Sequence, residues 1–328
     1  DSSVAALLLR DAGYDATGVT MKLFDNEVAG AGGACVVGES TCCSQSDVED
    51  ARQVAFGLGL EHFTFNFTGT FGCEVIDRFC DAYLRGRTPN PCIDCNRYLK
   101  FAALQRRRAQ LGFDYVATGH YARRAFNERT GRFELRRGLD EAKDQSYVLY
   151  HLTQDDLAHM LFPLGELTKP QVRELAEKHS FGNAHKAESQ DICFVPDGDY
   201  ASFIARYMRF GEDAARGDGR EPTVPAAFEP GDIVDVDGKV LGRHGGLVHY
   251  TIGQRKGIGI AAPEPLYVVG KDAAENVLVV GPRSELGVRE VRAGDVNLIS
   301  VAELDGPMRV TAKTHYRQRA QAGEAVME

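Results

Sequence analysis

Hydrophobic and polar positions along the first half of the chain follow periods that predict helices and strands in turn. Helical spacing marks some runs, and short runs rich in β-branched and aromatic residues mark others. The predicted helices cover residues 4–10, 47–58, 71–85 and 96–111, and the predicted strands cover 15–24, 61–67 and 115–118. This alternation is typical of a parallel α/β sheet, whose ligands bind at the carboxyl ends of its strands. Met21, Asn66 and the pair Gly119–His120 fall near such ends.

The pattern changes in the second half of the chain. After a short predicted helix at 201–210, residues 211–230 are rich in glycine, proline and charge and predict a linker. Short apolar runs between glycine-rich turns then predict strands. These strands cover residues 232–236, 266–270, 276–280 and 309–314. We expect small β modules here, ending in a compact barrel.

Composition is that of a globular protein, with 43% hydrophobic and 26% charged residues in a chain of 328. No apolar run has the length of a transmembrane helix, and the first residues do not resemble a secretory signal. Eight cysteines in a chain of this length predict reduced thiols in the cytoplasm rather than a disulfide scaffold.

Charge is unevenly distributed. The net charge of −9 argues against a nonspecific nucleic-acid coat. Residues 95–113 nevertheless contain five Lys or Arg and no acidic residue, and residues 307–323 contain four Lys or Arg and no acidic residue. Such runs are also typical of a solvated helix or strand face, so charge alone leaves RNA binding and simple solvation equally open.

Two cysteine segments lie where the chain should turn. Residues 88–96 read TPNPCIDCN, and residues 189–194 read SQDICF. Prolines exclude a regular helix or a central strand at the start of the first segment. We expect Cys95 to open the following helix, where the helix dipole and nearby basic residues favour a thiolate. The sequence therefore predicts a cysteine enzyme. The alternative is an inert packed thiol, and the apolar neighbours of Cys193 strengthen this alternative for that residue.

A series of motifs runs through the chain in a fixed order. They are CCS at 42–44, TPNP at 88–91, CN at 95–96, ATGHY at 117–121, KDQSY at 143–147, LFPLG at 161–165, SQDICF at 189–194 and YTIGQRKG at 250–257. Together they resemble the tRNA-specific 2-thiouridylase family. One of them alone would be weak, but the whole ordered set is highly specific.

The resemblance implies an α/β fold in three parts. A parallel-sheet PP-loop ATP pyrophosphatase domain, of the adenine nucleotide alpha hydrolase type, would cover residues 1–197. A small β-rich central domain that binds tRNA would cover 198–262, and a C-terminal β-barrel would cover 263–328. The family loop Ser-Gly-Gly-x-Asp-Ser would end at Asp1-Ser2, so its start would precede this chain, and the barrel would continue past Glu328.

The resemblance also implies the reaction, which thiolates the wobble uridine at position 34 of tRNA. ATP would adenylate the uridine, and Mg²⁺ would neutralise the departing pyrophosphate. Cys193 would carry a persulfide, and Cys95 would act as the second nucleophile and close a transient Cys95–Cys193 disulfide. The ATP site would include four residues: Asp1, Ser2, Met21 and Gly119.

One position departs from the common family pattern. Many members carry aspartate three residues before the nucleophile, and this chain has Cys92 there. Asp94 would then supply the acid or base. The alternative is that Cys92, Cys95 and Cys193 hold an iron–sulfur cluster with one open iron. The persulfide route is the preferred of the two hypotheses.

RNA contacts are implied by the resemblance as well. The target base, flipped from its stack, would meet Asn90, Pro91 and Cys92. The anticodon arm would contact His120, Lys143, Asp144 and Gln145, and RNA further away would contact His315 and Tyr316. A cysteine desulfurase or a sulfur-relay protein would donate the persulfide sulfur. The sequence does not specify the donor, the set of tRNAs or the oligomeric state.

Two other classes of protein remain as alternatives. A PP-loop enzyme of the argininosuccinate or GMP synthetase type also adenylates its substrate, but needs neither cysteine. A tRNA-binding protein built on a nucleotide domain would show no catalysis. Exchange of pyrophosphate into ATP in the presence of tRNA separates a pure binder from both enzymes.

Overall fold

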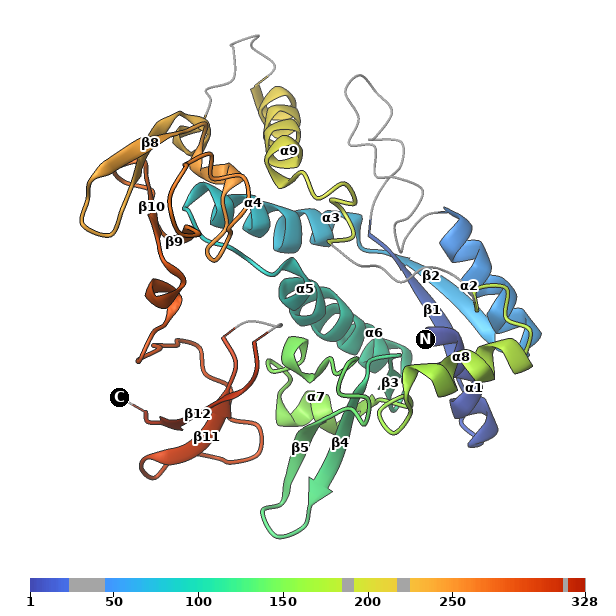
Figure 1. The fold of residues 1–328 in the computed structure, drawn as a ribbon. Helices are drawn as coiled ribbons and strands as arrows, with labels where there is room; N and C mark the ends of the chain where they lie inside the picture. Colours follow the sequence, from blue (N-terminus) through green and yellow to red (C-terminus); the bar gives the residue numbers. More distant parts are fainter. Residues whose placement is uncertain (24–44, 185–191, 217–224, 315–317, 328) are drawn as a thin grey trace.

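The first half of the molecule is a layer of parallel strand pairs among helices (Figure 1). The computed structural model describes residues 1–23, 45–184, 192–216, 225–314 and 318–327. Strand β1 (Thr17–Lys22) pairs in parallel with β2 (Glu61–Asn66), and β3 (Val116–Ala117) pairs in parallel with β6 (Met160–Leu161). An antiparallel hairpin of β4 (Ala122–Asn127) and β5 (Arg132–Arg137) follows β3. Parallel pairing confirms the predicted α/β class.

Helices surround these strands. The α-helices are α1 (Ser2–Asp11), α2 (Gln45–Gly57), α3 (Thr68–Phe71), α4 (Asp77–Leu84), α5 (Pro91–Asp94), α6 (Leu104–Leu111), α7 (Gln154–Ala158), α8 (Lys169–Lys178) and α9 (Tyr200–Arg216). Two π-helical segments, η1 (Gly72–Ile76) and η2 (Cys95–Ala103), join α3 to α4 and α5 to α6. A 3₁₀ turn, η3, covers Ser146–Val148. Within the described ranges, no helix is long and apolar enough to span a membrane.

The second half is built from antiparallel and parallel strand pairs. A four-stranded sheet has the order β8-β7-β10-β9, and β11 pairs with β12. The strands are β7 (Gly231–Val234), β8 (Val240–His244), β9 (Tyr267–Asp272), β10 (Val277–Gly281), β11 (Met308–Ala312) and β12 (Gln321–Ala325), and the 3₁₀ turns are η4 (Ala226–Phe228), η5 (Leu247–His249) and η6 (Arg283–Leu286). A closed barrel is not seen in the part of the chain that the structure describes.

One division expected from the sequence separates strands of a single sheet, and another falls inside a helix. β7 pairs in parallel with β10, so one hydrogen-bonded sheet contains strands from both sides of the division predicted between residues 262 and 263. Helix α9 also continues to Arg216, past its predicted end at 210, so the predicted linker begins within a helix. Apolar residues of α9 such as Phe203 and Ile204 are buried and stabilise it through tertiary packing.

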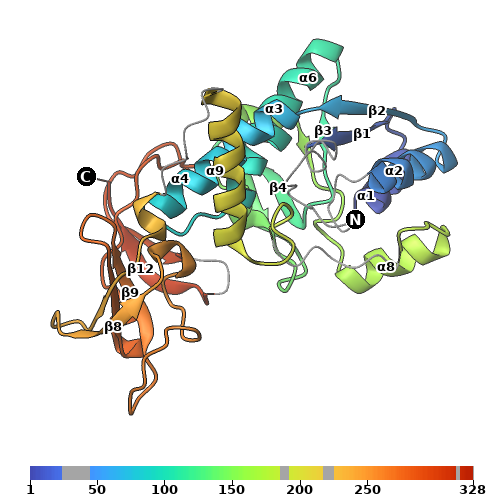
Figure 2. The same ribbon diagram turned by 90° about the horizontal axis from the view of Figure 1, so that it is seen from above.

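The largest core cluster joins α4, the segment after Cys193 and α9, which lie side by side in both views (Figures 1 and 2). Phe79 of α4 is fully buried, and its ring centroid lies 5.2 Å from that of Phe194 and 6.3 Å from that of Phe203. Phe194 is the residue after Cys193, so this aromatic packing fixes the backbone beside that thiol.

Truncating Phe79 should therefore destabilise the fold strongly. We expect Phe79→Ala to lower the free energy of unfolding by about 3–5 kcal/mol, because it removes buried area and leaves a cavity. Urea denaturation followed by circular dichroism measures this loss. As a control, Phe56→Ala removes a ring that is 85% exposed on α2 and should change the same free energy by less than about 0.5 kcal/mol. Equal losses in the two variants would contradict the described core.

Candidate active site

One continuous helix carries Cys95, running from Pro91 through α5, η2 and α6 to Leu111. Asn90 caps its start, because its side-chain oxygen accepts a hydrogen bond of 3.1 Å from the backbone amide of Cys92. Proline is favourable at the first helical position, where its missing N–H would have no partner in the helix anyway. The prediction that Cys95 opens the helix is therefore wrong. Cys95 lies in the second turn, where the dipole of the helix start acts more weakly.

The π-helical segment η2 lies between two hydrophobic cores. Leu99 is buried in the cluster that contains Phe79, whereas Phe101 is buried in a second cluster around Leu149 and Met160. Segment η2 also packs against η1, the other π-helical segment. π-helical turns are frequent at functional sites. Packing on two sides holds the backbone around Cys95 in one position.

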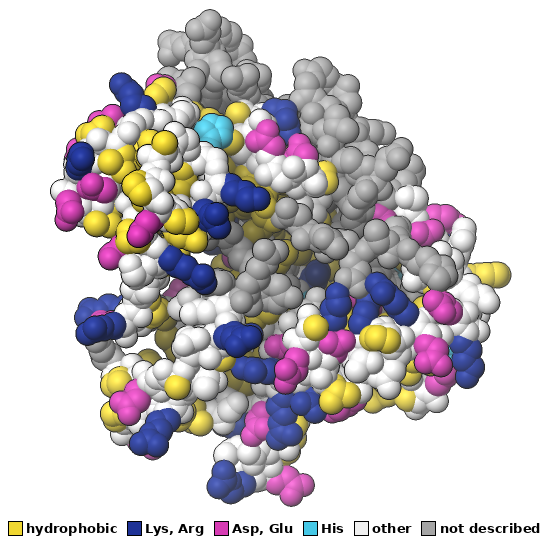
Figure 3. All heavy atoms as spheres, in the orientation of Figure 1, with side chains coloured by type: hydrophobic (Ala, Val, Ile, Leu, Met, Phe, Trp, Pro, Cys, Tyr) yellow, Lys and Arg dark blue, Asp and Glu magenta, His cyan; other side chains and the backbone are white. Residues whose placement is uncertain are grey.

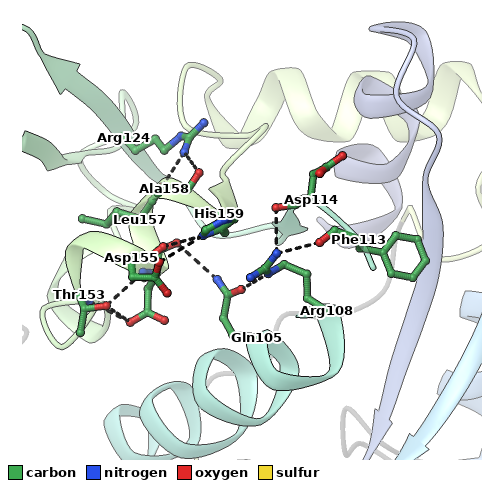
Figure 4. A network of polar contacts seen from close by, with 11 residues as sticks. Gln105, Arg108, Phe113, Asp114, Arg124, Thr153, Asp155, Leu157, Ala158 and His159 are labelled. Carbon is green, nitrogen blue, oxygen red and sulfur yellow. Dashed lines mark hydrogen bonds and ion pairs between the residues drawn. The ribbon is translucent and has the colours of Figure 1, made fainter. Parts of the chain in front are cut away.

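Polar contacts anchor the far end of the same helix (Figure 4). Arg108 of α6 donates a hydrogen bond of 2.8 Å to the backbone oxygen of Phe113, and its Nε donates one of 2.7 Å to the side-chain oxygen of Gln105. Arg124 of β4 donates to the backbone oxygens of Leu157 and Ala158 at 2.6 and 2.9 Å. These bonds tie α6 to the loop before β3, and β4 to the end of α7.

Cys95 and Cys193 pack against the same hydrophobic core, although 98 positions separate them in the sequence. Both side chains are partly buried, and both are thiols in this structure. Met21 of β1 packs against that core as well. The fold therefore brings the two predicted reactive cysteines and one predicted nucleotide-site residue to one core cluster. The Ser189–Asp191 part of the second cysteine motif lies outside the described residues.

Asp94, directly before Cys95, lies in a charged surrounding. Burial raises the pKa of its carboxyl group, while the positive charges of Arg78 and Arg97 partly oppose that rise. Arg78 also forms a salt bridge of 2.9 Å with Glu74. A raised pKa moves a carboxyl group toward the range in which it can exchange a proton near neutral pH.

Cys92 lies on the exposed side of the helix start, three residues before the partly buried Cys95. In the part of the chain that the structure describes, no three His, Cys, Asp or Glu side chains are grouped closely enough to hold a metal ion. Cys92, Cys95 and Cys193 therefore do not form a three-thiolate site in this conformation. The residues present do not fit an iron–sulfur cluster.

Gly119 lies directly against the start of the chain. A Cβ atom at this position would lie 2.9 Å from the backbone nitrogen of Ser2 and 3.0 Å from the carbonyl carbon of Asp1. Only a residue without a side chain allows this approach. Asp1 occupies the N-cap position of α1, but its side chain does not cap the helix. Three of the four predicted ATP-site residues are therefore adjacent in space.

The loop that contains Lys143, Asp144 and Gln145 is fastened by its own side chains. Asp144 Oδ1 accepts hydrogen bonds of 3.1 Å from the backbone amides of Gly138 and Ser146. Gln145 Oε1 accepts one of 3.1 Å from the backbone amide of Tyr121. The oxygens of Asp144 and Gln145 thus shape the loop, and Lys143 is partly buried beside them.

Of the remaining residues predicted to contact RNA, one is a buried histidine and two lie outside the described residues. His120 is 9% exposed, and its Nδ1 lies 2.8 Å from Oγ1 of Thr118. His315 and Tyr316 lie outside the described residues. Direct contact of the His120 ring with RNA therefore requires its surroundings to open.

The burial of His120 and His151 gives the fold a specific acid sensitivity. Their rings flank Phe101, at centroid distances of 5.8 and 5.7 Å. Burial, aided by nearby positive charges, lowers the pKa of His120 to about 3 and that of His151 to about 4. Both values lie below the ordinary pKa of 6.5, so the unfolded chain binds more protons as the pH falls below 6.5. Their stabilising contribution is complete above pH 6.5 and is lost as the pH falls toward 3.

We expect His120→Gln to flatten the dependence of unfolding free energy on pH between 6.5 and 4. The wild-type slope should exceed that of the variant by about 1.4 kcal/mol per pH unit, the linkage of one proton. Urea denaturation at several pH values measures both slopes. His179→Gln, which removes an exposed imidazole, serves as the control and should keep the wild-type slope. An unchanged slope in His120→Gln would show that His120 is not held neutral by the fold.

The site contains three residues that were not predicted from the sequence. Tyr121 and Lys169 both contact Asp1, and Asn96 is buried beside Cys95 with its Oδ1 lacking a hydrogen-bond partner among the described residues. Tyr121 and Asn96 are the last residues of the motifs at 117–121 and 95–96, and these motifs were the signal that could have identified them. No local signal marked Lys169, because its partner lies at the other end of the domain.

Comparisons with known proteins cover nearly the whole chain. Residues 1–197 match the family model described as tRNA methyl transferase HUP domain, and residues 224–282 match the one described as tRNA methyl transferase PRC-barrel domain. The chain is 47% identical over 330 residues to the tRNA-specific 2-thiouridylase MnmA of Carboxydothermus hydrogenoformans, covering 100% of this chain and 84% of that protein. It is 47% identical over 317 residues to the protein of that name from Moorella thermoacetica, covering 97% and 83%. For the one from Clostridioides difficile, the identity is 44% over 316 residues, covering 96% and 81%.

Proposed function

This chain belongs to the tRNA-specific 2-thiouridylase family, and we propose that it uses ATP and a protein persulfide to convert the wobble uridine of tRNA, position 34, to 2-thiouridine. One observation of the structure carries the proposal. Cys95 and Cys193, far apart in sequence, pack against the same hydrophobic core, which Met21 also contacts. A reaction that passes sulfur between two thiols beside a nucleotide needs this convergence.

The first step of the proposed reaction activates the base. The 2-oxygen of the uridine attacks the α-phosphate of ATP, forms a bond to AMP and releases pyrophosphate. Asp1, Ser2 and Gly119 support a nucleotide site, because their backbones meet at the N-terminus of α1, where free amides suit a phosphate. Mg²⁺ neutralises pyrophosphate when bound, and one carboxylate plus phosphate oxygens is a usual ligand set for it, which Asp1 would fit.

Sulfur transfer then follows in two displacements. The outer sulfur of the Cys193 persulfide attacks C2 of the adenylated uridine, and AMP leaves with the former 2-oxygen. The Cys95 thiolate next attacks Sγ of Cys193, which breaks the sulfur–sulfur bond and releases 2-thiouridine. The protein is left with a Cys95–Cys193 disulfide, which a thiol reductant returns to two thiols with two electrons and two protons. Asp94, with its raised pKa, is the proposed acid or base beside Cys95.

Binding of tRNA is supported by the distribution of charge. Lys and Arg side chains run across the middle of the face in Figure 3, although the whole chain carries a net charge of −9. Phosphate contacts by such residues would hold the anticodon arm in place. Asn90, Pro91 and Cys92 at the helix start would meet the flipped base. His120, Lys143, Asp144, Gln145, His315 and Tyr316 are the further proposed contacts to tRNA.

A protein donor would load the persulfide on Cys193, either a cysteine desulfurase or a sulfur-relay protein, in the cytoplasm. Neither alternative class accounts for the pair of cysteines on one core. A synthetase of the argininosuccinate or GMP type would not need them, and a tRNA binder without catalysis would not need an ATP site.

The test is a reconstituted reaction with defined components. The protein is incubated with an unmodified tRNA transcript, ATP, Mg²⁺, a cysteine desulfurase and cysteine, and the digested nucleosides are measured by mass spectrometry. We expect 2-thiouridine at position 34 that depends on both ATP and cysteine. Pyrophosphate release without 2-thiouridine would indicate an adenylating enzyme of another kind, and tRNA binding without pyrophosphate release would indicate a binder.

A further inference from the structure

The carboxylate of Asp1 is held by two residues from distant parts of the chain. Its Oδ1 accepts a hydrogen bond of 2.9 Å from the hydroxyl of Tyr121 and one of 2.8 Å from Nζ of Lys169. Tyr121 is 3% exposed, and the Lys169 side chain is 14% exposed. Asp1, at the chain start labelled N in Figure 1, is the N-cap residue of α1, and α1 packs against α8. Two largely buried donors thus converge on a single oxygen at the proposed nucleotide site.

The same two residues also hold the loop of residues 138–148. The backbone amide of Tyr121 donates to Oε1 of Gln145 at 3.1 Å, and the amide of Gln145 donates back to the oxygen of Tyr121 at 2.9 Å. The backbone amide of Lys169 donates to Oδ2 of Asp140 at 2.9 Å. The loop is therefore connected to Asp1 by two routes, one through Tyr121 and one through Lys169, which together close a ring of hydrogen bonds.

The ring leaves little room for movement of one part alone. A Cβ atom on Gly138 would lie 2.8 Å from the backbone oxygen of Tyr121, so the loop backbone packs directly on that residue. A displacement of Asp1 must therefore be followed by Tyr121, by the loop, or by a broken hydrogen bond. Closely packed elements of this kind respond to a ligand by changing between discrete arrangements.

We propose that Tyr121 and Lys169 couple nucleotide binding at Asp1 to tRNA binding by the 138–148 loop, an inference that rests on the proposed function. The negative charge of a bound triphosphate adds to that of Asp1 and holds the Lys169 ammonium group in its contact with Asp1, while Tyr121 keeps Asp1 and the loop together. Because the nucleotide orders the ring, tRNA meets a loop that is already fixed and binds more tightly. Tyr121 acts here as a positioning residue. By thermodynamic linkage, tRNA must tighten nucleotide binding by the same factor.

The experiment measures tRNA affinity with and without nucleotide. The probe is α,β-methylene-ATP with Mg²⁺, which cannot adenylate the base, and the RNA is an unmodified tRNA transcript. For the wild-type protein we expect the nucleotide to lower the Kd for tRNA by about five-fold or more. The coupling ratio is the Kd for tRNA without nucleotide divided by the Kd with nucleotide. In Tyr121→Phe, which removes a single hydroxyl group, this ratio should fall to within about two-fold of one, while the Kd without nucleotide stays within about three-fold of wild type. Tyr14→Phe, at a 45% exposed tyrosine after α1, is the matched control and should keep the full ratio.

Lys169→Met provides an independent test, and the reciprocal measurement completes the cycle. In this variant the coupling ratio should also fall close to one. In the wild type, tRNA should lower the Kd for nucleotide by the same factor by which nucleotide lowers the Kd for tRNA. Coupling that survives in both Tyr121→Phe and Lys169→Met would overturn the inference, as would a wild-type ratio of one in a protein that forms 2-thiouridine. A wild-type protein that binds neither ligand, or forms no 2-thiouridine, would instead contradict the proposed function.

Discussion

Replacing Cys95 by serine is expected to stop the reaction after sulfur has reached the RNA, and replacing Cys193 is expected to stop it before. Each change should lower the rate of 2-thiouridine formation by at least about a thousand-fold, because a covalent nucleophile is lost. In Cys95→Ser the persulfide still attacks the adenylated base, and a tRNA–S–S–Cys193 adduct should accumulate. In Cys193→Ser neither the persulfide nor the adduct can form.

Mass spectrometry and non-reducing gels separate these two outcomes. Loading with a desulfurase and cysteine should add about 32 Da, one sulfur atom, to the peptide of Cys193 in the wild type and in Cys95→Ser, but not in Cys193→Ser. Cys73→Ser, at an exposed cysteine on η1, is the control and should keep wild-type activity. A Cys95→Ser or Cys193→Ser variant that retains a tenth of the activity would contradict the assigned roles.

Adding one methyl group at Gly119 should have the second largest effect. The new Cβ would lie 2.9 Å from the amide nitrogen of Ser2, closer than real Cβ atoms approach, and 3.0 Å from the carbonyl carbon of Asp1, which is unusually tight. The start of α1 must therefore shift away from the proposed phosphate position. A misplacement of about 1 Å can cost about a hundred-fold in rate, so we expect kcat/KM for ATP to fall by that order in Gly119→Ala.

Thermal unfolding distinguishes a local effect at Gly119 from general loss of structure. Gly119→Ala should remain folded, because the clash involves only the chain start and the turn after β3. Gly57→Ala, where the added Cβ meets no described atom within 4 Å beyond the neighbouring backbone of its own helix, is the matched control and should keep both activity and stability. Normal use of ATP by Gly119→Ala would show that Gly119 and Asp1 do not form the nucleotide site.

The class of the fold could be predicted from the sequence because hydrophobic periodicity is a local signal. The strand expected at 61–67 is β2, and the helix expected at 71–85 matches the second part of the helical run from α3 to α4, which ends at Leu84. The hairpin of β4 and β5 was missed, since its sequences ARRAFN and RFELRR carry too many basic residues to show a clear period of two. Its strands are recognisable only from their pairing with each other.

The error at Cys95 has a different origin. Two prolines close together suggested a turn, but the second of them, Pro91, occupies the first position of a helix that Asn90 caps. Proline both ends and begins helices, and the sequence does not say which role applies. The structure decides in favour of the second, because the helix from Pro91 onward can pack Leu99 and Phe101 into two cores.

The parts of the site that join distant segments could not be predicted from physical patterns. The hydrogen bond between Lys169 and Asp1 spans 168 positions. The placement of Cys95 and Cys193 against one core likewise depends on tertiary packing, which no local period encodes. The roles of these residues were predicted from the resemblance of their motifs to a family.

Disulfides counted in a single turnover test the proposed transfer of sulfur between the two cysteines. The protein is loaded with persulfide sulfur, freed of reductant, and mixed with tRNA and Mg²⁺-ATP. Peptides are then analysed by mass spectrometry under non-reducing conditions, and 2-thiouridine is counted in the same sample. We predict one Cys95–Cys193 disulfide for each 2-thiouridine formed. Formation of 2-thiouridine in a protein whose Cys95 and Cys193 both remain thiols would show that these two residues do not pass sulfur to the RNA.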